Sequence, residues 1–285
     1  MNTPTQKIID TDNIPFSVCM CVYHKDNPSY FQKAVESINN LQTIKSVEII
    51  IVVDGPIYGE LEDIVSSYEK ENKDIKVTRL TKNCGHAVAR QTSIDNATNN
   101  IVAIMDADDI AIKERFEKQL NFLKIHPEID VIGGQIEEFI DDIDNVVGKR
   151  DVPLNNHEIY MRMKSRCPFN QMTVMFRKDK VIKVGGYIDW FCNEDYYLWI
   201  RMAEAGCKFA NLPDTLVNVR VGSDMYARRG GWKYFKSEKG LQDYMLKKKM
   251  ISLPRYIFNV AVRFGVQVAM PNSIRGFIFQ KLFRK

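Results

Sequence analysis

The stretch IVAIMDADDI, residues 101–110, joins five apolar residues directly to a group of carboxylates. Such a continuous apolar run is typical of a strand that is buried on both faces of a parallel sheet. Asp106, Asp108 and Asp109 come at its carboxyl end, the edge where such sheets bind ligands. Like charges this close raise one another's pKa unless a cation lies among them. The stretch therefore fits a solvated loop in which Asp109 caps the next helix, or a site for Mg²⁺ or Mn²⁺.

The sequence around this stretch alternates between apolar strands and amphipathic helices. Strands are predicted at residues 16–23, 47–55, 75–80 and 101–105, and helices at 26–42, 59–71 and 86–97. This β-α-β series predicts an α/β fold with a Rossmann-like, mostly parallel sheet flanked by helices. Further along, helices are predicted at 112–124 and 193–205, and strands at 130–139 and 172–178. Residues 137–170 and 210–232 are expected to be loops that shape a pocket.

The composition is that of a globular protein without a secretory or membrane-spanning segment. The chain has 285 residues, of which 45% are hydrophobic and 27% are charged. The polar amino-terminal stretch lacks the apolar core of a signal peptide, and no apolar run approaches the roughly 20 residues of a spanning helix. The six cysteines form no Cys-x-x-Cys pair, which favours a reduced, cytosolic protein over a disulfide framework or a zinc site.

Basic residues are concentrated at the carboxyl end of the chain. From Lys247 onward there are nine lysines and arginines and no acidic residue, whereas the preceding part carries 31 basic and 36 acidic residues. This segment fits a helix pair packed on the domain, or a surface that lies on anionic lipid headgroups. Nucleic acid is the least favoured partner, because the rest of the chain is acidic and contains no nucleic-acid-binding motif.

Three further stretches place polar residues where a strand or a loop meets the next element. Asp54, in VVDGP, suits either a turn or a carboxylate that accepts hydrogen bonds from a base or ribose. In NCGHAVARQ, residues 83–91, a turn with glycine leads into a helix that carries Arg90, which together suit an anion. Glu194 and Asp195 open the helix NEDYYLWIRM, where the helix dipole favours acids and where a carboxylate could also serve as a general base.

In this order and spacing, the stretches resemble the nucleotide-sugar glycosyltransferases of family 2 across about residues 14–225. FSVCMCVY resembles the opening strand, VVDG the uridine-contacting strand end, and NCGHAVAR the Asn-x-Gly-x-x-x-Ala-Arg segment. MDADD resembles the metal-binding Asp-x-Asp, and NEDYYLWIRM the helix that bears the base. CPFNQMTVMFRK and PNSIRGFIFQK further resemble bacterial exopolysaccharide and O-antigen transferases of the amylovoran-biosynthesis type. Gln91 and Gln171 depart from the pattern, which has Asn and His at these positions.

The resemblance implies a GT-A fold and a role for each matching residue. Asp195 would be the catalytic base of an inverting, single-displacement reaction. Asp106 and Asp108 would bind the metal ion, Mn²⁺ or Mg²⁺, and Asp106 would also contact the ribose. The residues expected to bind substrate are Val22, Tyr23, Asp54, Asn83, Gly85, Arg90, Asp106, Ala107, Asn170 and Glu194.

The same resemblance implies an enzyme of bacterial surface-polysaccharide synthesis. It would move a hexose, with galactose or glucose favoured, from a UDP-sugar to an undecaprenyl-diphosphate-linked glycan. Residues 1–225 would form the catalytic domain, with a nucleotide-sugar half at about 14–110 and an acceptor half at about 111–225. Residues 226–285 would form a basic, amphipathic, helical extension. The enzyme would be cytoplasmic and peripheral at the inner face of the cytoplasmic membrane.

Two other functions are compatible with parts of the pattern. A nucleotidyltransferase also combines such a sheet with an acid-bound metal, but residues 16–30 lack the Gly-rich, basic loop that a nucleoside triphosphate needs. A non-catalytic sugar-nucleotide-binding or scaffold protein of a polysaccharide assembly complex would need neither Asp108 nor Asp195, and both are present. The enzyme is therefore the favoured interpretation.

Overall fold

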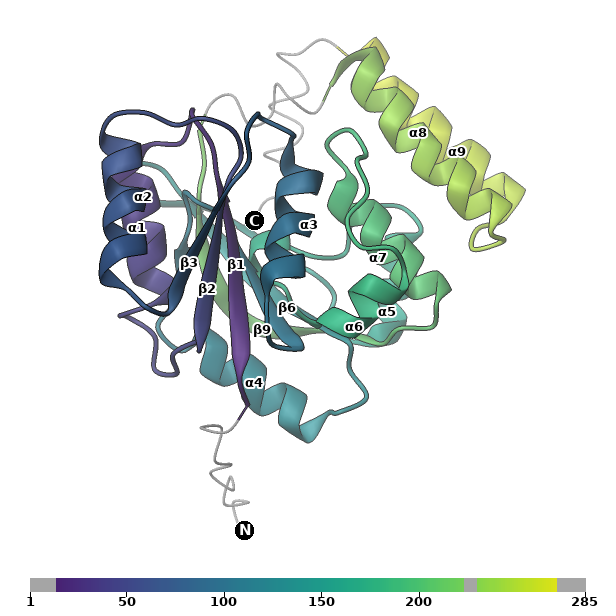
Figure 1. The fold of residues 1–285 in the computed structure, drawn as a ribbon. Coiled ribbons are helices and arrows are strands. Elements are labelled where there is room, and N and C mark those ends of the chain that lie inside the picture. Colours follow the sequence, from purple (N-terminus) through teal and green to yellow (C-terminus); the bar gives the residue numbers. More distant parts are fainter. Residues whose placement is uncertain (1–13, 223–229, 271–285) are drawn as a thin grey trace.

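The amino-terminal half alternates strands and helices as predicted. The computed structural model describes residues 14–222 and 230–270 (Figure 1). The elements of this half are β1 Phe16–Val22, α1 Pro28–Ile38, β2 Glu48–Val53, α2 Glu60–Glu71, β3 Ile75–Arg79, α3 His86–Asn96 and β4 Ile101–Met105. Helix α1 begins where the Asn27 side chain accepts a hydrogen bond from the Tyr30 backbone N–H, with Pro28 in the first turn.

The second half mixes strands of both directions with shorter helices. Its elements are β5 Ile110–Ala111, α4 Arg115–Ile125, β6 Val131–Phe139, β7 Val146–Arg150, α5 Asn156–Met163, β8 Met175–Arg177, α6 Lys178–Lys183, α7 Glu194–Glu204 and β9 Phe209–Arg220. The prediction that residues 137–170 and 210–232 are loops is wrong, because β7, α5 and most of β9 lie within them. The strand predicted at 172–178 is reduced to three residues, because a 3₁₀ turn occupies Gln171–Thr173.

Strand β9 was not predicted because its alternation is interrupted. Pro213 and Asp214 stand in the middle of the run FANLPDTLVNVR. The pairing of β9 with β6 shifts register near this point, between Gly133 and Gln135, as a bulge allows. Pairing with β6 and β5 therefore makes one strand of 12 residues from a sequence that suggests two short pieces.

The strands form one sheet in the order β3-β2-β1-β4-β8-β6-β9-β5, and β7 pairs with β6 outside this path. The four strands from β3 to β4 are all parallel, and β8 joins them to β6 as an antiparallel strand. The register pairs Val22 at the end of β1 with Val53 at the end of β2. Asp54 and Asp106 therefore follow strand ends at the same edge of the sheet.

Helices cover both faces of the sheet and divide the core in two (Figure 1). On β2, Ile49, Ile51 and Val53 belong to one apolar cluster, whereas Ile50 and Val52 belong to the other. The first cluster includes residues of α1, α2 and α4, and the second includes residues of α3, α5, α7 and α8. Burial on both faces explains why the sequence of this strand is continuously apolar.

A helical hairpin follows the sheet, made of α8 Gly231–Lys247 and α9 Leu253–Phe264 (upper right of Figure 1). Leu241 and Met245 of α8 belong to the same apolar cluster as Trp199 of α7, so the hairpin packs on the body. Over these two helices the predicted helical extension is confirmed, while its full range of 226–285 and the division of the chain at residue 225 stay predictions. The matched stretch PNSIRGFIFQK, residues 271–281, lies outside the described residues.

In the described ranges 14–222 and 230–270, no helix has the length and apolar character needed to cross a bilayer.

Candidate active site

Asp54 organises the turn that connects β3 to α3. Its two carboxylate oxygens accept hydrogen bonds from the backbone N–H groups of Cys84 and Gly85, at 2.6 and 2.9 Å. The Asn83 side chain donates to the Asp54 carbonyl oxygen at 3.2 Å. Gly85, the N-cap of α3, has a φ of 88°, a conformation that L side chains rarely adopt. The motifs VVDG and NCG therefore form one structural unit, in which each Asp54 carboxylate oxygen retains a further lone pair.

Arg90 links the Asp-x-Asp motif to the helix that carries the predicted base. Its guanidinium donates to Asp106 Oδ1 and to Glu194 Oε1, each at 3.0 Å. The Arg90 side chain is only 9% exposed, so water screens these ion pairs weakly. The three residues come from α3, from the loop after β4 and from α7. Arg90 therefore fixes the geometry between the two acidic motifs, while its contact with the nucleotide stays a prediction.

The carboxylates that follow β4 differ in their environments. Asp106 is half-buried in its ion pair, whereas Asp108 lies at the surface. Asp109 is buried and accepts a hydrogen bond from the Arg220 backbone N–H at 2.9 Å. Burial, Asp108 and Asp106 raise the pKa of Asp109 well above its usual value. Asp109 therefore binds strand β9 and does not cap the next helix, whose N-cap is Glu114.

A fourth carboxylate, Asp26, lies beside the Asp-x-Asp motif and was missed in the sequence. Its Oδ2 accepts a hydrogen bond from the Tyr23 backbone N–H at 2.9 Å, in the turn after β1. Burial, together with the negative charges of Asp108 and Asp106, raises the pKa of Asp26 to about 7 despite this bond. Negative charge thus accumulates at this edge of the sheet. The spacing in sequence gave no signal, because Asp26 follows its strand by several residues.

The acids at this edge fit a divalent cation that also binds a substrate. Asp106 and Asp108 supply two carboxylates, and Mg²⁺ sites usually combine one or two carboxylates with substrate phosphates. The repulsion that raises the pKa of Asp26 would be relieved by a cation. Within residues 14–222 and 230–270, no group of three or more His, Cys, Asp or Glu is arranged to hold a metal by itself. A diphosphate as a further ligand of such a cation stays a prediction.

Asp195 lies in the first turn of α7, next to Glu194. Its Oδ1 accepts a hydrogen bond from the Tyr196 backbone N–H at 2.6 Å, and the Cys167 sulfur lies 3.9 Å from its Oδ2. Burial and the negative charge of Glu194 raise the pKa of Asp195 to about 6, and Arg90 opposes this shift. A carboxylate with a pKa close to neutral can take up and release a proton, as a general base must.

The two positions that depart from the family pattern meet at Tyr187, which the sequence did not single out. Gln91 Oε1 accepts a hydrogen bond from the Tyr187 backbone N–H at 2.7 Å, and Gln171 Nε2 donates to the Tyr187 hydroxyl at 2.6 Å. A Cβ at position 186 would lie 2.0 Å from Gln91 Oε1, so Gly186 is needed there. The two glutamines thus belong to one buried contact, which no local sequence pattern could reveal.

The remaining residues predicted to bind substrate differ in burial. Val22 and Ala107 are buried, and Tyr23 is half-buried. Asn170 is fully buried, and its side-chain amide donates to the Gly134 carbonyl oxygen at 2.9 Å. Asn170 therefore packs behind the site, and its direct contact with a substrate stays a prediction.

Comparison with known sequences gives the relatives of the chain. The model of the family "Glycosyl transferase family 2" matches residues 17–188. The amylovoran biosynthesis glycosyltransferase AmsE of Erwinia amylovora is 37% identical over 266 residues, 93% of this chain and 98% of that protein. The UDP-Gal:alpha-D-GlcNAc-diphosphoundecaprenol beta-1,3-galactosyltransferase of Escherichia coli is 34% identical over 277 residues, 96% of this chain and 99% of that protein.

Comparison with solved structures agrees on the fold. S. aureus TarS in complex with UDP-GlcNAc superposes with a TM-score of 0.65 at 16% identity, over 94% of this chain and 76% of that chain. At this identity the likeness concerns the fold alone, a GT-A-type sheet with flanking helices. With the family match and the two relatives, it follows that the chain belongs to glycosyl transferase family 2 and is a glycosyltransferase.

Proposed function

We propose that this glycosyltransferase moves a hexose from a UDP-sugar to a lipid-linked oligosaccharide in the synthesis of a bacterial surface polysaccharide. The observation that carries the proposal is the bridge from Asp106 through Arg90 to Glu194. It brings the predicted donor and metal motif together with the helix of the predicted base. A transferase needs both at one site, whereas a nucleotide-binding or scaffold protein needs only the first.

The proposed reaction is a single in-line displacement with inversion. Asp195 takes the proton of an acceptor hydroxyl while the hydroxyl oxygen forms a bond to the anomeric carbon. The bond from that carbon to the UDP oxygen breaks, and UDP leaves with the electron pair. Asp106 and Asp108 would hold Mn²⁺ or Mg²⁺, which supplies Lewis-acid stabilisation of the leaving diphosphate. Arg90 holds Asp106 at a fixed position relative to α7.

The Asp54 unit is the proposed site of the uridine. The N–H groups of Cys84 and Gly85 orient the Asp54 carboxylate, whose remaining lone pairs suit an N–H of a base. A UDP-sugar donor is supported by the E. coli relative, whose name includes UDP-Gal, and by the TarS structure with UDP-GlcNAc. The E. coli name favours galactose over glucose and indicates a diphosphoundecaprenol-linked acceptor.

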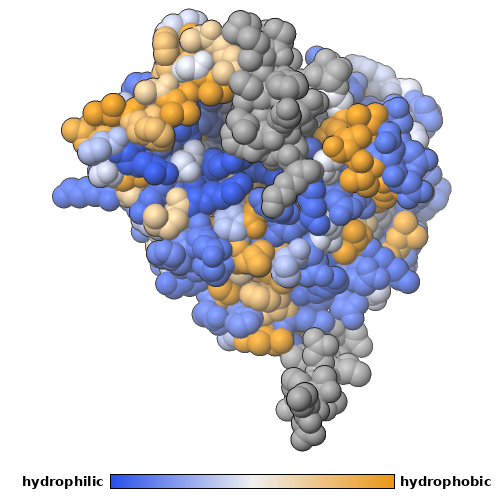
Figure 2. All heavy atoms as spheres, turned by 180° about the vertical axis from the view of Figure 1, so that it is seen from behind, coloured by the Kyte–Doolittle hydropathy of each residue, from blue (hydrophilic) through white to orange (hydrophobic). Residues whose placement is uncertain are grey.

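Helix α9 supports the proposal that the enzyme works at a membrane. Most of its outward residues are apolar: Leu253, Ile257, Phe258 and Val262 are 57%, 57%, 61% and 47% exposed. Its buried residues, Asn259 and Arg263, are polar. This is the reverse of a surface helix on a water-soluble domain. Figure 2 shows hydrophobic residues on the surface at the end of the molecule formed by the hairpin.

Basic residues beside this face favour a lipid bilayer as its partner. Lys247, Lys248, Lys249 and Arg255 are exposed at the start of α9 and in the turn before it. An amphipathic helix with flanking cations suits anionic headgroups, and a lipid-linked acceptor would be presented at the same surface. We therefore place the enzyme in the cytoplasm, peripheral at the inner face of the cytoplasmic membrane.

A donor screen tests the proposed activity. The purified protein is incubated with Mn²⁺ and each UDP- or GDP-sugar, with and without a synthetic lipid-diphosphate-sugar acceptor, and release of UDP or GDP is measured. We expect acceptor-stimulated release from UDP-galactose or UDP-glucose. The variants Asp195→Asn and Asp108→Asn should each lose this release by about 10² to 10⁴-fold, since each removes one group from the chemical step.

Nucleotide-binding controls distinguish the proposed transferase from a non-catalytic binding protein. Asp195→Asn should still bind UDP in the presence of Mn²⁺, because its substitution leaves the Asp54 unit and the Asp-x-Asp motif intact. Metal-dependent UDP binding without transfer to any acceptor would instead support a non-catalytic binding protein. Full activity in Asp195→Asn would remove that residue from the role of base.

A further inference from the structure

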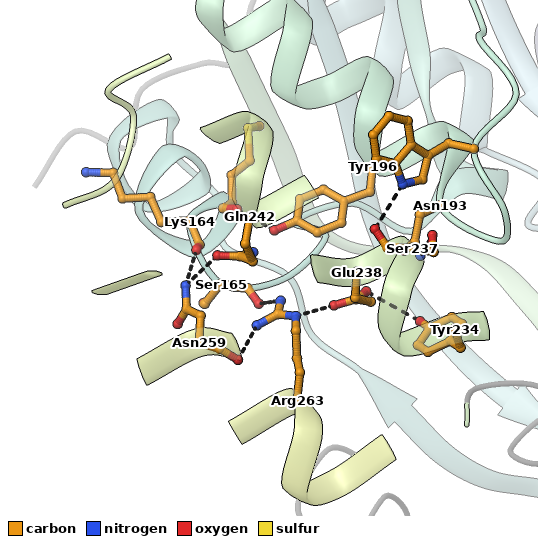
Figure 3. A network of polar contacts seen from close by, with 12 residues as sticks. Lys164, Ser165, Asn193, Tyr196, Tyr234, Ser237, Glu238, Gln242, Asn259 and Arg263 are labelled. Carbon is orange, nitrogen blue, oxygen red and sulfur yellow. Dashed lines mark hydrogen bonds and ion pairs between the residues drawn. The ribbon is translucent and has the colours of Figure 1, made fainter. Parts of the chain in front are cut away.

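Helix α9 turns its polar residues inward, against the segment that leads from α5 toward the candidate active site (Figure 3). Asn259 and Arg263 are 3% and 9% exposed. Buried polar groups destabilise a fold unless they are hydrogen-bonded. The hydrogen-bond partners of Asn259 and Arg263 therefore indicate which part of the domain the inward face of α9 stabilises.

Asn259 and Arg263 bind backbone carbonyl groups just after α5. Arg263 Nη2 donates to the Ser165 carbonyl oxygen at 2.5 Å, and Arg263 Nε pairs with Glu238 of α8 at 2.5 Å. Asn259 Nδ2 donates to the Lys164 carbonyl oxygen at 2.8 Å. Carbonyl groups at a helix carboxyl end lack partners within the helix and favour a nearby cation. Helix α9 thus fixes the end of α5 from outside.

The helix of the proposed base binds the same segment from the other side. The hydroxyl of Tyr196, the residue after Asp195, donates to the Met163 carbonyl oxygen at 2.5 Å. The consecutive carbonyl groups of residues 163–165 are therefore divided between α7 and α9. Cys167 follows two residues later, and its sulfur lies 3.9 Å from Asp195 Oδ2. Residues 163–167 thus connect the contacts made by α9 with the Asp195 carboxylate.

Helix α8 binds the turn that precedes α7. Ser237 Oγ accepts a hydrogen bond from Asn193 Nδ2 at 3.1 Å and donates to the Phe191 carbonyl oxygen at 2.6 Å. The Ser237 carbonyl oxygen accepts from Trp190 Nε1 at 3.0 Å. A Cβ at Gly240 would lie 2.8 Å from the Trp190 ring. Glycine weakens a helix interior, so this contact accounts for its place in α8.

We propose that the α8–α9 hairpin holds Asp195 in its working position, with Arg263 and Ser237 as positioning residues. The proposal rests on the proposed function, because it takes Asp195 as the base. Arg263 acts through residues 163–167, and Ser237 acts through the turn at 190–193. Since the outward face of α9 is the proposed lipid-facing surface, one rigid element would set the base relative to the lipid anchor of the acceptor.

Two variants test the proposal by their separate effects on kcat and KM. Arg263→Lys keeps a positive charge beside Glu238 but loses the planar fork that reaches Ser165. Ser237→Ala removes only a hydroxyl. We expect kcat to fall about tenfold in Arg263→Lys and about threefold in Ser237→Ala, because small displacements of a catalytic group slow the chemical step. The KM for the UDP-sugar should stay within about twofold of wild type, since the donor groups are untouched.

Lys236→Ala, at an exposed position of α8, is the matched control and should change neither parameter. A folded Arg263→Lys with wild-type kcat, or with a donor KM that rises as much as kcat falls, would overturn the proposal. Should Arg263→Lys fail to fold, Ser237→Ala decides: a wild-type kcat overturns the proposal, and a lower kcat with an unchanged KM supports it. Failure of the proposed function would give a different result, because Asp195→Asn would then keep its activity. Both proposals would then be rejected.

Discussion

The parallel strands β3-β2-β1-β4 and helix α9 arrange polar and apolar residues in opposite ways. In β2, Ile50 and Val52 are fully buried, and the polar residues stand at the two ends of the strand, Glu48 as its first residue and Asp54 just after its last. In α9 the polar residue Arg263 is buried and the apolar residue Ile257 is 57% exposed. The strands follow the usual rule for a soluble domain, whereas α9 reverses it.

The strands and α9 differ in where their side chains find packing and hydrogen-bond partners. The strands bury their side chains within the chain itself, between two layers of helices. Helix α9 satisfies its buried polar groups with backbone carbonyls and Glu238, and leaves an apolar face that the described residues do not cover. The first region finds its partners within the chain, and the partner that we propose for the second is a lipid bilayer.

The largest effect is expected next to the parallel strands, from Arg90→Met in helix α3. The substitution leaves Asp106 and Glu194 without their shared cation in a poorly hydrated site. Removing one partner of such a pair costs about 3 kcal/mol of unfolding free energy, and activity should fall about 100-fold or more. Urea unfolding and UDP release measure the two effects. Arg90→Lys keeps the charge but loses the planar fork, so its unfolding free energy and its activity should both lie between those of Arg90→Met and wild type. Wild-type stability in Arg90→Met would contradict a stabilising role for the Asp106–Arg90–Glu194 ion pairs.

The next effect is the pH dependence of the proposed base. The pKa of Asp195 is raised to about 6, and only the ionised carboxylate can accept a proton. The ratio kcat/KM should therefore be constant above pH 7, fall below pH 6, and be about tenfold lower at pH 5. Glu194→Gln removes a charge that raises this pKa, so the fall should move to lower pH. A profile that stays flat from pH 8 to pH 5 would exclude Asp195 as the base.

A smaller effect is expected from a charge on the outward face of α9. Ile257→Glu should weaken binding to vesicles that contain anionic lipid by about tenfold, because the side chain would no longer enter the apolar boundary. Ile125→Glu, on α4, is the matched control, since Ile125 is also 57% exposed. Vesicle flotation measures binding. Equal binding of both variants would reject α9 as the lipid surface, and a change from dimer to monomer in Ile257→Glu would assign the face to a second copy.

The smallest effect concerns an exposed ion pair on α8, next to Tyr256 of α9. Lys239 and Asp243 are separated by four residues on α8, and their side chains are 40% and 48% exposed. Lys239→Ala should change the unfolding free energy by less than about 0.5 kcal/mol, because water screens such pairs. Chemical denaturation measures this change. A loss of several times this size would mean that the hairpin depends on surface charge more than on its buried contacts.

The sequence predicted the parallel half well because each signal there is local. Continuous apolar runs mark strands buried on both faces, and Asp54 and Asp106 mark their ends. The sequence did not predict the features that depend on contacts with distant segments of the chain. The strand β9 contains Pro213 and forms only because β6 and β5 lie on either side of it. Asp109, expected to cap the next helix or to belong to a cation site, instead accepts a hydrogen bond from the Arg220 backbone N–H of that same strand.

The sequence by itself determined the family and the order of the acidic motifs, because these depend on residue type and spacing along the chain. Only the tertiary structure decided that Arg90 joins Asp106 to Glu194, that Gln91 and Gln171 meet at Tyr187, and that Arg263 points inward. Each of these contacts joins residues from separate elements, and none leaves a periodic signal in the sequence. The physical reason is that a side chain's partner depends on where packing brings distant segments together, which local propensity does not encode.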